Sequence, residues 1–125
     1  MFEQDYVMRQ IQQLSKALAK ILFSIDAESP SSSLIKDMEA RSAADNLLRK
    51  IDSGNINEAE YELFALIENR TMDNLLAGIV FYSYLNEKDD DYLEINDFSR
   101  DDVENGIRHL LSEYGLENMA DIFFI

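Results

Sequence analysis

The sequence predicts an all-α fold, a helical bundle of four to five helices, and three observations support this prediction. Hydrophobic residues make up 46% of the 125 residues and charged residues 29%, which is enough apolar material for a packed core. One Pro and four Gly are too few turn formers for a β-sandwich or barrel of many short strands. Apolar residues also recur at helical spacing along most of the chain. We expect a single all-helical domain over residues 1–125.

The first expected helix spans residues 3–25 and carries a heptad seam. The apolar residues of this seam are Val7, Ile11, Leu14, Leu18, Ile21 and Ile25. Such a seam is typical of a helix that packs lengthwise along another helix. That second helix could belong to the same chain or to a second copy of it. The seam is therefore the first candidate interaction surface.

A linker is expected at residues 27–33, where the only Pro of the chain, Pro30, is followed by three Ser. A helix over residues 34–52 follows, and Ser32 or Ser33 is expected to cap it. The expected core face of this helix consists of Leu34, Met38, Ala44, Leu47, Leu48 and Ile51. Gly54 is expected to end it, because Gly adopts a positive φ at little cost.

The third expected helix spans residues 58–69 and forms an αα-hairpin with the second. Asn57 and Glu60 have the spacing of a capping box at its start. Tyr61, Phe64 and Ile67 are expected to line one of its sides. The segment Gly54 to Ala59, followed by Leu63 and Phe64, resembles the turn and second helix of a tetratricopeptide unit. One partial match predicts a helical hairpin but no solenoid, because such units stack in arrays.

The fourth expected helix spans residues 71–85 and is predicted to be the most buried. Its run Ile79 to Tyr82 could form a strand, but no second strand exists to pair with it. Gly78 would allow a neighbouring helix to approach closely.

An acidic loop at residues 86–98 is expected to be anchored by Tyr92, Leu93 and Phe98. The last long helix spans residues 100–114, with Ser99 as its cap and Asp102 at the third helical position. Gly115 ends it. The apolar tail Ile122–Ile125 is expected to dock on the bundle, as a short helix, or to meet a partner.

The charge of −14 lies almost entirely in the second half of the chain. Residues 1–56 hold 8 acids and 7 bases, whereas residues 57–125 hold 17 acids and 4 bases. A chain with this charge would be repelled by nucleic acid and by anionic membranes. No stretch is long and apolar enough for a membrane span, and the N-terminus lacks the pattern of a secretory signal. We therefore expect a cytoplasmic protein.

Few kinds of catalytic chemistry fit the composition. Without Cys, disulfides and thiolate chemistry are excluded, and with one His a site that needs two imidazoles is excluded. No dinucleotide, phosphate-loop or nucleophile-elbow motif occurs. His109 is expected to lie off the apolar face of its helix and to pair with Glu113. We expect no catalytic residue, no cofactor and no small-molecule substrate.

The densest run of acids is the candidate acidic surface. Its residues are Asp89, Asp90, Asp91, Glu94, Asp97, Asp101 and Asp102. The calcium-binding loop of an EF-hand needs a Gly at its sixth position. A loop that starts at Asp89 has Glu94 there, and a loop that starts at Asp91 has Asn96, so an EF-hand is excluded. A solvated face, a weak irregular site for calcium or magnesium, and a docking surface for a basic partner all remain open. No residue is assigned as a metal ligand.

Several motifs resemble those of a known family. They are the segment Asp5 to Ile11 with Leu14 and Ala19 to Leu22, the turn Gly54 to Glu60, and the block from Phe98-Ser99 to Tyr114-Gly115. The chain resembles an uncharacterised family of short all-helical proteins from low-GC Gram-positive bacteria. The resemblance implies a helical fold and a cytoplasmic bacterial setting, and it implies no catalytic residue.

Three functions follow from the sequence. The first is a non-enzymatic protein–protein interaction module, or a homodimer formed through the heptad seam or the apolar tail. The second is an acidic inhibitor or nucleic-acid mimic that binds a basic partner through residues 86–104. The third is a weak metal site held by carboxylates. Salt dependence, solution mass and metal-dependent melting separate the three.

Overall fold

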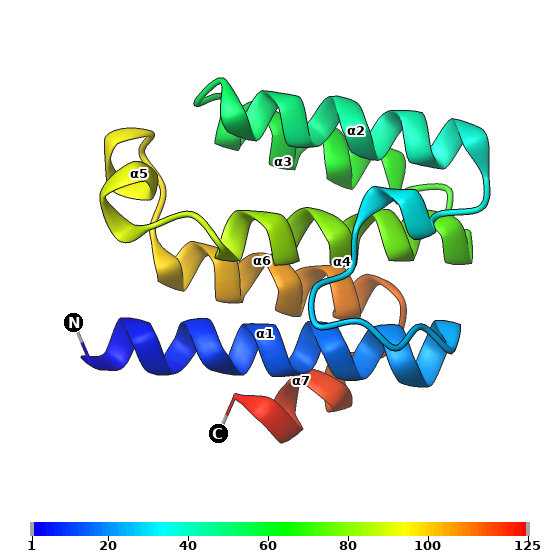
Figure 1. Ribbon diagram of the computed structural model, residues 1–125, viewed down its shortest axis with the longest axis horizontal. Helices are drawn as coiled ribbons and strands as arrows, with labels where there is room; N and C mark the ends of the chain where they lie inside the picture. The colour runs from blue at the N-terminus through cyan, green and yellow to red at the C-terminus, as the bar shows by residue number, and fades with distance from the viewer. Residues whose placement is uncertain (1, 125) are drawn as a thin grey trace.

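The computed structural model describes residues 2–124, and within this range it holds helices and no β-strand (Figure 1). In chain order the elements are α1 (Phe2–Phe23), the 3₁₀ helix η1 (Ser32–Leu34), α2 (Met38–Asp52), α3 (Ile56–Leu66), α4 (Met72–Asn86), α5 (Asp90–Ile95), α6 (Arg100–Glu113) and α7 (Glu117–Phe123). The all-α prediction is confirmed. Five of the α-helices correspond to the five expected ones, α7 contains the start of the expected apolar tail, and α5 is a short addition.

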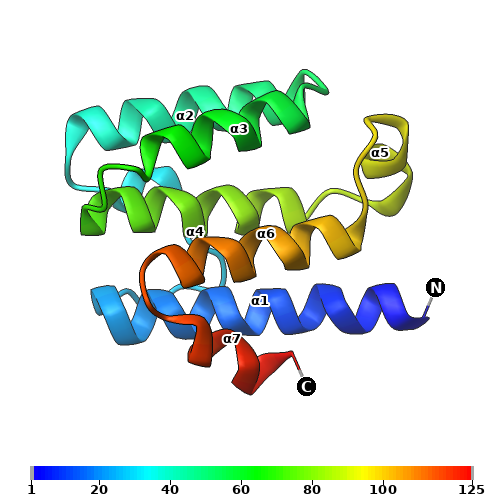
Figure 2. The ribbon, with the colours of Figure 1, turned by 180° about the vertical axis from the view of Figure 1, so that it is seen from behind.

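Helix α4 lies at the centre of the fold. It packs against α1, α2 and α6, while α2 and α3 pack against each other and α7 packs against α1 and α6. In Figure 1 the α2–α3 pair forms the upper layer, α4 and α6 the middle, and α1 and α7 the lower. Figure 2 shows that α3 and α6 run in the same direction on the same side of the molecule. This parallel arrangement positions the cleft described below.

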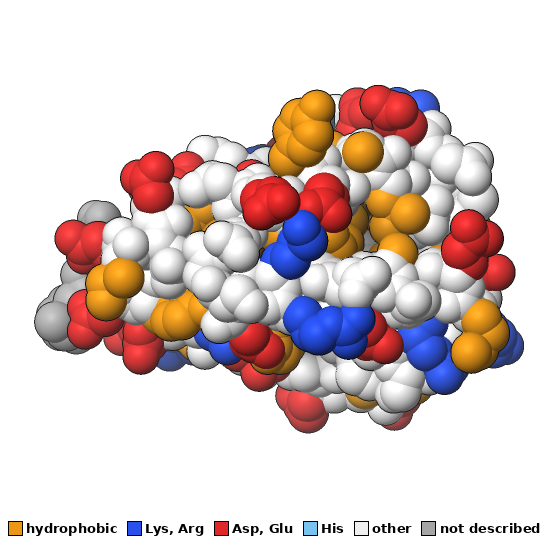
Figure 3. Space-filling model, turned by 90° about the horizontal axis from the view of Figure 1, so that it is seen from above, with side chains coloured by type: hydrophobic (Ala, Val, Ile, Leu, Met, Phe, Trp, Pro, Cys, Tyr) orange, Lys and Arg blue, Asp and Glu red, His pale blue; other side chains and the backbone are white. Residues whose placement is uncertain are grey.

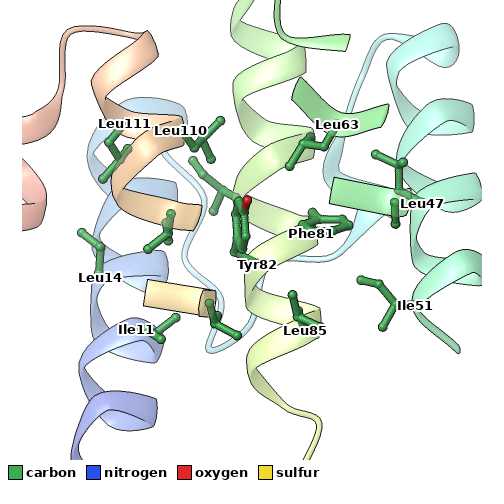
Figure 4. Close-up of a cluster of buried hydrophobic side chains, with 14 of the residues drawn as sticks. Ile11, Leu14, Leu47, Ile51, Leu63, Phe81, Tyr82, Leu85, Leu110 and Leu111 are labelled. Atoms are coloured by element: carbon green, nitrogen blue, oxygen red, sulfur yellow. The ribbon is translucent and has the colours of Figure 1, made fainter. Parts of the chain in front are cut away.

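The side chains of α4 confirm that it is the most buried helix. Phe81 and Tyr82 are fully buried, and Figure 4 shows Phe81 facing Leu47 and Leu63 while Tyr82 lies nearer to Leu110. A Cβ at Gly78 would lie 2.7 Å from Leu110 Cδ1. The missing side chain therefore lets α6 approach α4, as the sequence predicts.

The start of α2 differs from the prediction. The helix begins at Met38, and its cap is Asp37, whose carboxylate accepts a hydrogen bond of 2.8 Å from the Ala40 N–H. Ile35 is extended and fully buried, and Arg41 donates to its carbonyl, so the chain cannot continue as a helix through this point. Met38 is 70% exposed, so its expected place in the core is wrong.

The capping box expected at Asn57 and Glu60 is also wrong. Helix α3 begins at Ile56, after Gly54 has turned the chain with a φ of +84°. The Asn57 side chain donates to the Asp97 carbonyl instead, and Glu60 accepts from Tyr82. The helix ends at Leu66, whose carbonyl accepts from the Asn74 side chain. Tertiary contacts thus use the groups that the local pattern assigned to capping.

The expected acidic loop contains a short helix, α5. Asp89 caps it by accepting a hydrogen bond of 2.8 Å from the Tyr92 N–H. The expected anchors are confirmed, because Leu93 and Phe98 are buried and Tyr92 packs against the core. Local capping chemistry and these anchors together explain why an acidic segment forms a helix here.

The last two helices agree with the sequence. Ser99 and Asp102 form a reciprocal capping box at the start of α6, and Gly115 follows the helix with a φ of +70°. The tail docks as α7: Gln10 donates to the Phe123 carbonyl, and Arg108 donates to the Phe124 carbonyl. Ile125, the last residue of the expected apolar tail, lies outside the described residues.

Candidate binding cleft between α3 and α6

The heptad seam of α1 lies mostly inside the chain. Ile11, Leu14 and Leu18 are fully buried, and Val7 and Ile25 are partly buried. Ile21 is the exception and is 67% exposed. The helices that cover the seam belong to the same chain, because α1 packs against α4, α6 and α7. Five of the six seam residues are therefore at least partly covered by other parts of the described chain.

The candidate acidic surface lies at one end of the molecule, on α5 and the start of α6. Three of its residues serve the fold: Asp89 and Asp102 cap helices, and Asp90 pairs with the buried Arg100. The side chains of the other four, Asp91, Glu94, Asp97 and Asp101, are exposed. In Figure 3, which looks onto the upper layer, acidic side chains prevail toward the end where α5 lies, whereas Lys and Arg lie mainly over the middle and right.

The four bases of the second half are all engaged by acids. The ion pairs are Arg70 with Glu113, Lys88 with Asp52, Arg100 with Asp90, and Arg108 with Glu104 and Asp121. The positive charge of this half is therefore neutralised locally, and the exposed acids set the sign of its field. Among residues 2–124, no three His, Asp or Glu side chains are placed to hold a metal ion.

A cleft of about 500 Å³ lies between α3 and α6, and both acidic and aromatic residues line it. From α3 it is lined by Asn57, Glu60, Tyr61 and Phe64, and from α6 by Asp102, Asn105, Gly106 and His109, with Phe98 beside them. Both sets have the spacing of one helical face, and the two helices run in the same direction (Figure 2). The two faces meet where Gly106 lies against Glu60 and where Phe64 stacks on His109. The volume is within the range of ligand-binding clefts, about 300–1,000 Å³.

Glu60 and Tyr82 meet at the floor of this cleft. Tyr82 reaches from the buried helix α4 and donates a hydrogen bond of 2.6 Å to Glu60 Oε2. A Cβ at Gly106 would lie 2.5 Å from the Tyr82 hydroxyl and 2.6 Å from Glu60 Oε2. Gly106 is therefore the position at which α6 leaves room for this pair.

The floor of the cleft holds a half-buried carboxylate, that of Glu60. Burial raises the pKa of Glu60, and the nearby Asp102 carboxylate raises it further, while the Tyr82 hydrogen bond and His109 act in the opposite direction. Burial and Glu60 raise the pKa of Tyr82 well above its ordinary value, so this phenol remains a donor. An ionised Glu60 thus lacks part of the hydration that it would have in water. A cation that entered the cleft would compensate for this lost hydration.

Aromatic rings form the far end and the rim of the cleft. The rings of Phe64 and His109 stack with their centroids 4.3 Å apart. The expected pair of His109 with Glu113 is wrong, because Glu113 is held by Arg70 and His109 turns to Phe64. Tyr61, expected on an apolar side of its helix, is 79% exposed at the rim. No Lys or Arg is among the described residues that line this cleft.

The sequence indicates Asn57 as a capping residue and Asp102 both as a capping residue and as part of the candidate acidic surface. It does not indicate Glu60, Tyr82 and Gly106 as one group. The available signal is the matching spacing of Asn57, Glu60 and Phe64 with Asp102, Gly106 and His109. That spacing gives a face on each helix, and only the fold shows that the two faces oppose each other.

Residues 1–115 match the model of a family of unknown function, DUF6483. The chain belongs to this family. No curated protein and no solved structure matches it. Every residue that lines the cleft lies within the part of the chain that DUF6483 covers, whereas α7 lies beyond it. Within residues 2–124, none of the helices has the length and apolar character to cross a membrane.

Proposed function

We propose that this protein is a non-enzymatic interaction module that binds a positively charged protein partner through its acidic second half. The observation that carries the proposal is the cleft between α3 and α6, where Glu60 and Asp102 lie among aromatic side chains without a Lys or Arg of the described chain beside them. A protein that itself binds nucleic acid presents the kind of basic surface that fits.

The packing of the apolar surfaces supports this choice over a homodimer. The seam of α1 is mostly core, and Phe123 and Phe124 of the tail pack against the core, although Ile122 is 68% exposed. The two apolar candidates for self-association are therefore largely used inside one chain. The exposed acids remain, and their uneven distribution would orient and attract a basic partner.

The α2–α3 hairpin contributes one wall of the proposed site. Its likeness to a tetratricopeptide unit is part of the proposal, and so is a bacterial, cytoplasmic setting. Helix α3 presents Asn57, Glu60, Tyr61 and Phe64 on the face turned to α6. A single hairpin with this face would hold a short segment of the partner rather than a long peptide.

Titration with fluorescein-labelled octalysine, followed by anisotropy, tests the proposal. We expect saturable binding at about 50 mM salt that weakens at least tenfold by about 300 mM, because exposed charges are screened. Salt-insensitive binding or no binding overturns the proposal. Light scattering on the same samples gives the mass, and a dimer at both salt concentrations would instead favour self-association through an apolar surface.

A matched pair of triple variants separates a local site from net charge. The first carries Asp91→Asn, Glu94→Gln and Asp101→Asn, and the second carries Asp5→Asn, Asp26→Asn and Glu39→Gln. Both remove three exposed negative charges. We expect the first to weaken octalysine binding about fivefold and the second less than twofold. Equal weakening by the two variants would show that net charge alone attracts the peptide.

A further inference from the structure

We propose that the cleft between α3 and α6 receives one side chain of the partner, and that it selects the guanidinium of an arginine over the ammonium of a lysine. This inference rests on the proposed function and names the chemical group that the cleft recognises. It draws on the opposed faces of α3 and α6, on the Glu60–Tyr82 pair and on the aromatic wall.

The charge of the lining determines the sign of the ligand. The Asp102 carboxylate is close enough to contribute to the raised pKa of Glu60, and the described lining holds no Lys or Arg. Tyr82 provides one hydrogen bond to Glu60 Oε2. A carboxylate accepts about four hydrogen bonds, so Glu60 retains capacity for a donor that enters from the cleft.

The depth of Glu60 favours a weakly hydrated cation. Its carboxylate is half-buried, and burial raises its pKa. A cation that reaches it must leave much of its water behind. A guanidinium is more weakly hydrated than an ammonium and gives a carboxylate two parallel hydrogen bonds. An arginine side chain therefore loses less on entering the cleft than a lysine side chain does.

The flat walls provide the second basis for selection. Phe64 and His109 stack with an interplanar angle of 21°, and Tyr61 stands exposed at the rim. Each ring of this pair covers one face of the other, so a planar guanidinium would stack on an outer face of the pair or on Tyr61. A tetrahedral ammonium has no flat face with which to stack. Asn57 and Asn105 add amide groups at the sides of the cleft. Charge and shape thus point to the same group.

Nuclear magnetic resonance of the ¹⁵N-labelled full chain tests the inference with Nα-acetyl-arginine amide and Nα-acetyl-lysine amide as probes. We expect the arginine probe to shift the amide signals of Asn105, Gly106 and His109 in a saturable way, and to bind about fivefold or more tightly than the lysine probe. Equal binding of the two probes, or shifts confined to α5, overturns it.

Three variants locate the interaction. Glu60→Gln keeps an acceptor for the Tyr82 hydroxyl and removes the charge, so we expect at least fivefold weaker binding of the arginine probe. Glu68→Gln removes the same charge from an exposed position near the end of α3, outside the cleft, and should leave binding unchanged. Phe64→Leu should reduce the preference for arginine, because it removes the flat wall. Unchanged binding by Glu60→Gln overturns the inference.

The two proposals fail in different ways. If octalysine binds with the expected salt dependence but neither small probe shifts the cleft, the acidic interaction module stands and the arginine pocket is wrong. If the arginine probe saturates the cleft but octalysine does not bind, the pocket stands and the broader acidic surface is wrong.

Discussion

The Tyr82 hydroxyl donates a 2.6 Å hydrogen bond to Glu60 Oε2 across the floor of the cleft. The two residues come from different helices, α4 and α3, and Gly106 of α6 leaves the space in which they meet. This contact links the core of the fold to its candidate site. The contact can also be tested, because Tyr82→Phe removes only the hydroxyl and Glu60→Gln removes only the charge.

Removing the Tyr82 hydroxyl should raise the pKa of Glu60. Burial already holds that pKa above the usual range, and the Tyr82 hydrogen bond opposes the rise by stabilising the ionised carboxylate. In Tyr82→Phe the opposing contribution is lost. Carboxyl ¹³C titration measures the change. Tyr61→Phe, at an exposed position of the same cleft, should leave the pKa of Glu60 where it is, and a lower pKa in Tyr82→Phe would contradict the account.

Glu60 should also make stability depend on pH. Because its pKa is higher in the folded chain than in the unfolded chain, its contribution to stability is fully present below the ordinary pKa of a glutamate. That contribution is lost as the pH rises through the folded-state pKa. We therefore expect Glu60→Gln to gain stability relative to the wild type between pH 4 and pH 7. Urea unfolding over this range checks it, and a difference that does not vary with pH would be inconsistent with a half-buried carboxylate.

Gly106→Ala should destabilise the fold, although Ala is the better helix former. In an open helix this exchange gains about 1 kcal/mol. Here the added Cβ would clash with Tyr82 Cε1 and lie 2.6 Å from Glu60 Oε2, so the cleft floor must shift. We expect a net loss of about 1–3 kcal/mol in the free energy of unfolding. Asn105→Ala, at the exposed neighbouring position, is the control, and a stabilised Gly106→Ala would show that the floor is not tightly packed.

Arg100 should be the most sensitive charged residue of the acidic end. Its side chain is 2% exposed, donates to the carbonyls of Asn86 and Lys88, and pairs with Asp90 at 2.8 Å. Arg100→Met removes the donor to the carbonyls of the buried Asn86 and of Lys88, and we expect a loss of about 1–3 kcal/mol. Thermal or urea unfolding measures it. Arg9→Met, at an exposed position of α1, should change stability by less than about 0.5 kcal/mol.

The heptad seam should behave as core. Leu14→Ala removes a fully buried side chain and should cost about 2–5 kcal/mol. Ile21→Ala, in the same seam but 67% exposed, should cost less than about 1 kcal/mol. Unfolding experiments compare the two. A change in solution mass in Leu14→Ala with little loss of stability would instead show that the seam joins two chains.

The sequence predicts the long helices well because apolar periodicity marks their core faces, and capping residues and glycines mark their ends. Ser99 with Asp102, Gly54 and Gly115 all act as their residue types suggest. The most buried helix and the role of Gly78 were also predictable, because a segment that is apolar all round has no solvent face.

The differences arise where a distant contact overrides a local preference. Ile35 is drawn into the core in an extended conformation, so α2 starts at Met38 rather than at residue 34. The spacing of Glu60 suits a cap on its own helix, but its carboxylate accepts a hydrogen bond from the Tyr82 hydroxyl instead. The cleft depends on α3 and α6 being parallel neighbours, and helical spacing within either segment does not show that. Its members were visible in the sequence, but their arrangement was not.

The most direct test of the central claim is a ¹H–¹⁵N chemical-shift map of the full chain with unlabelled octaarginine at about 50 mM salt, where charge screening is weak. We expect the largest saturable shifts on the turns of α3 and α6 that line the cleft, from Asn57 to Phe64 and from Asp102 to His109. Shifts that centre on α1 and α7, or no saturable shifts, would contradict it.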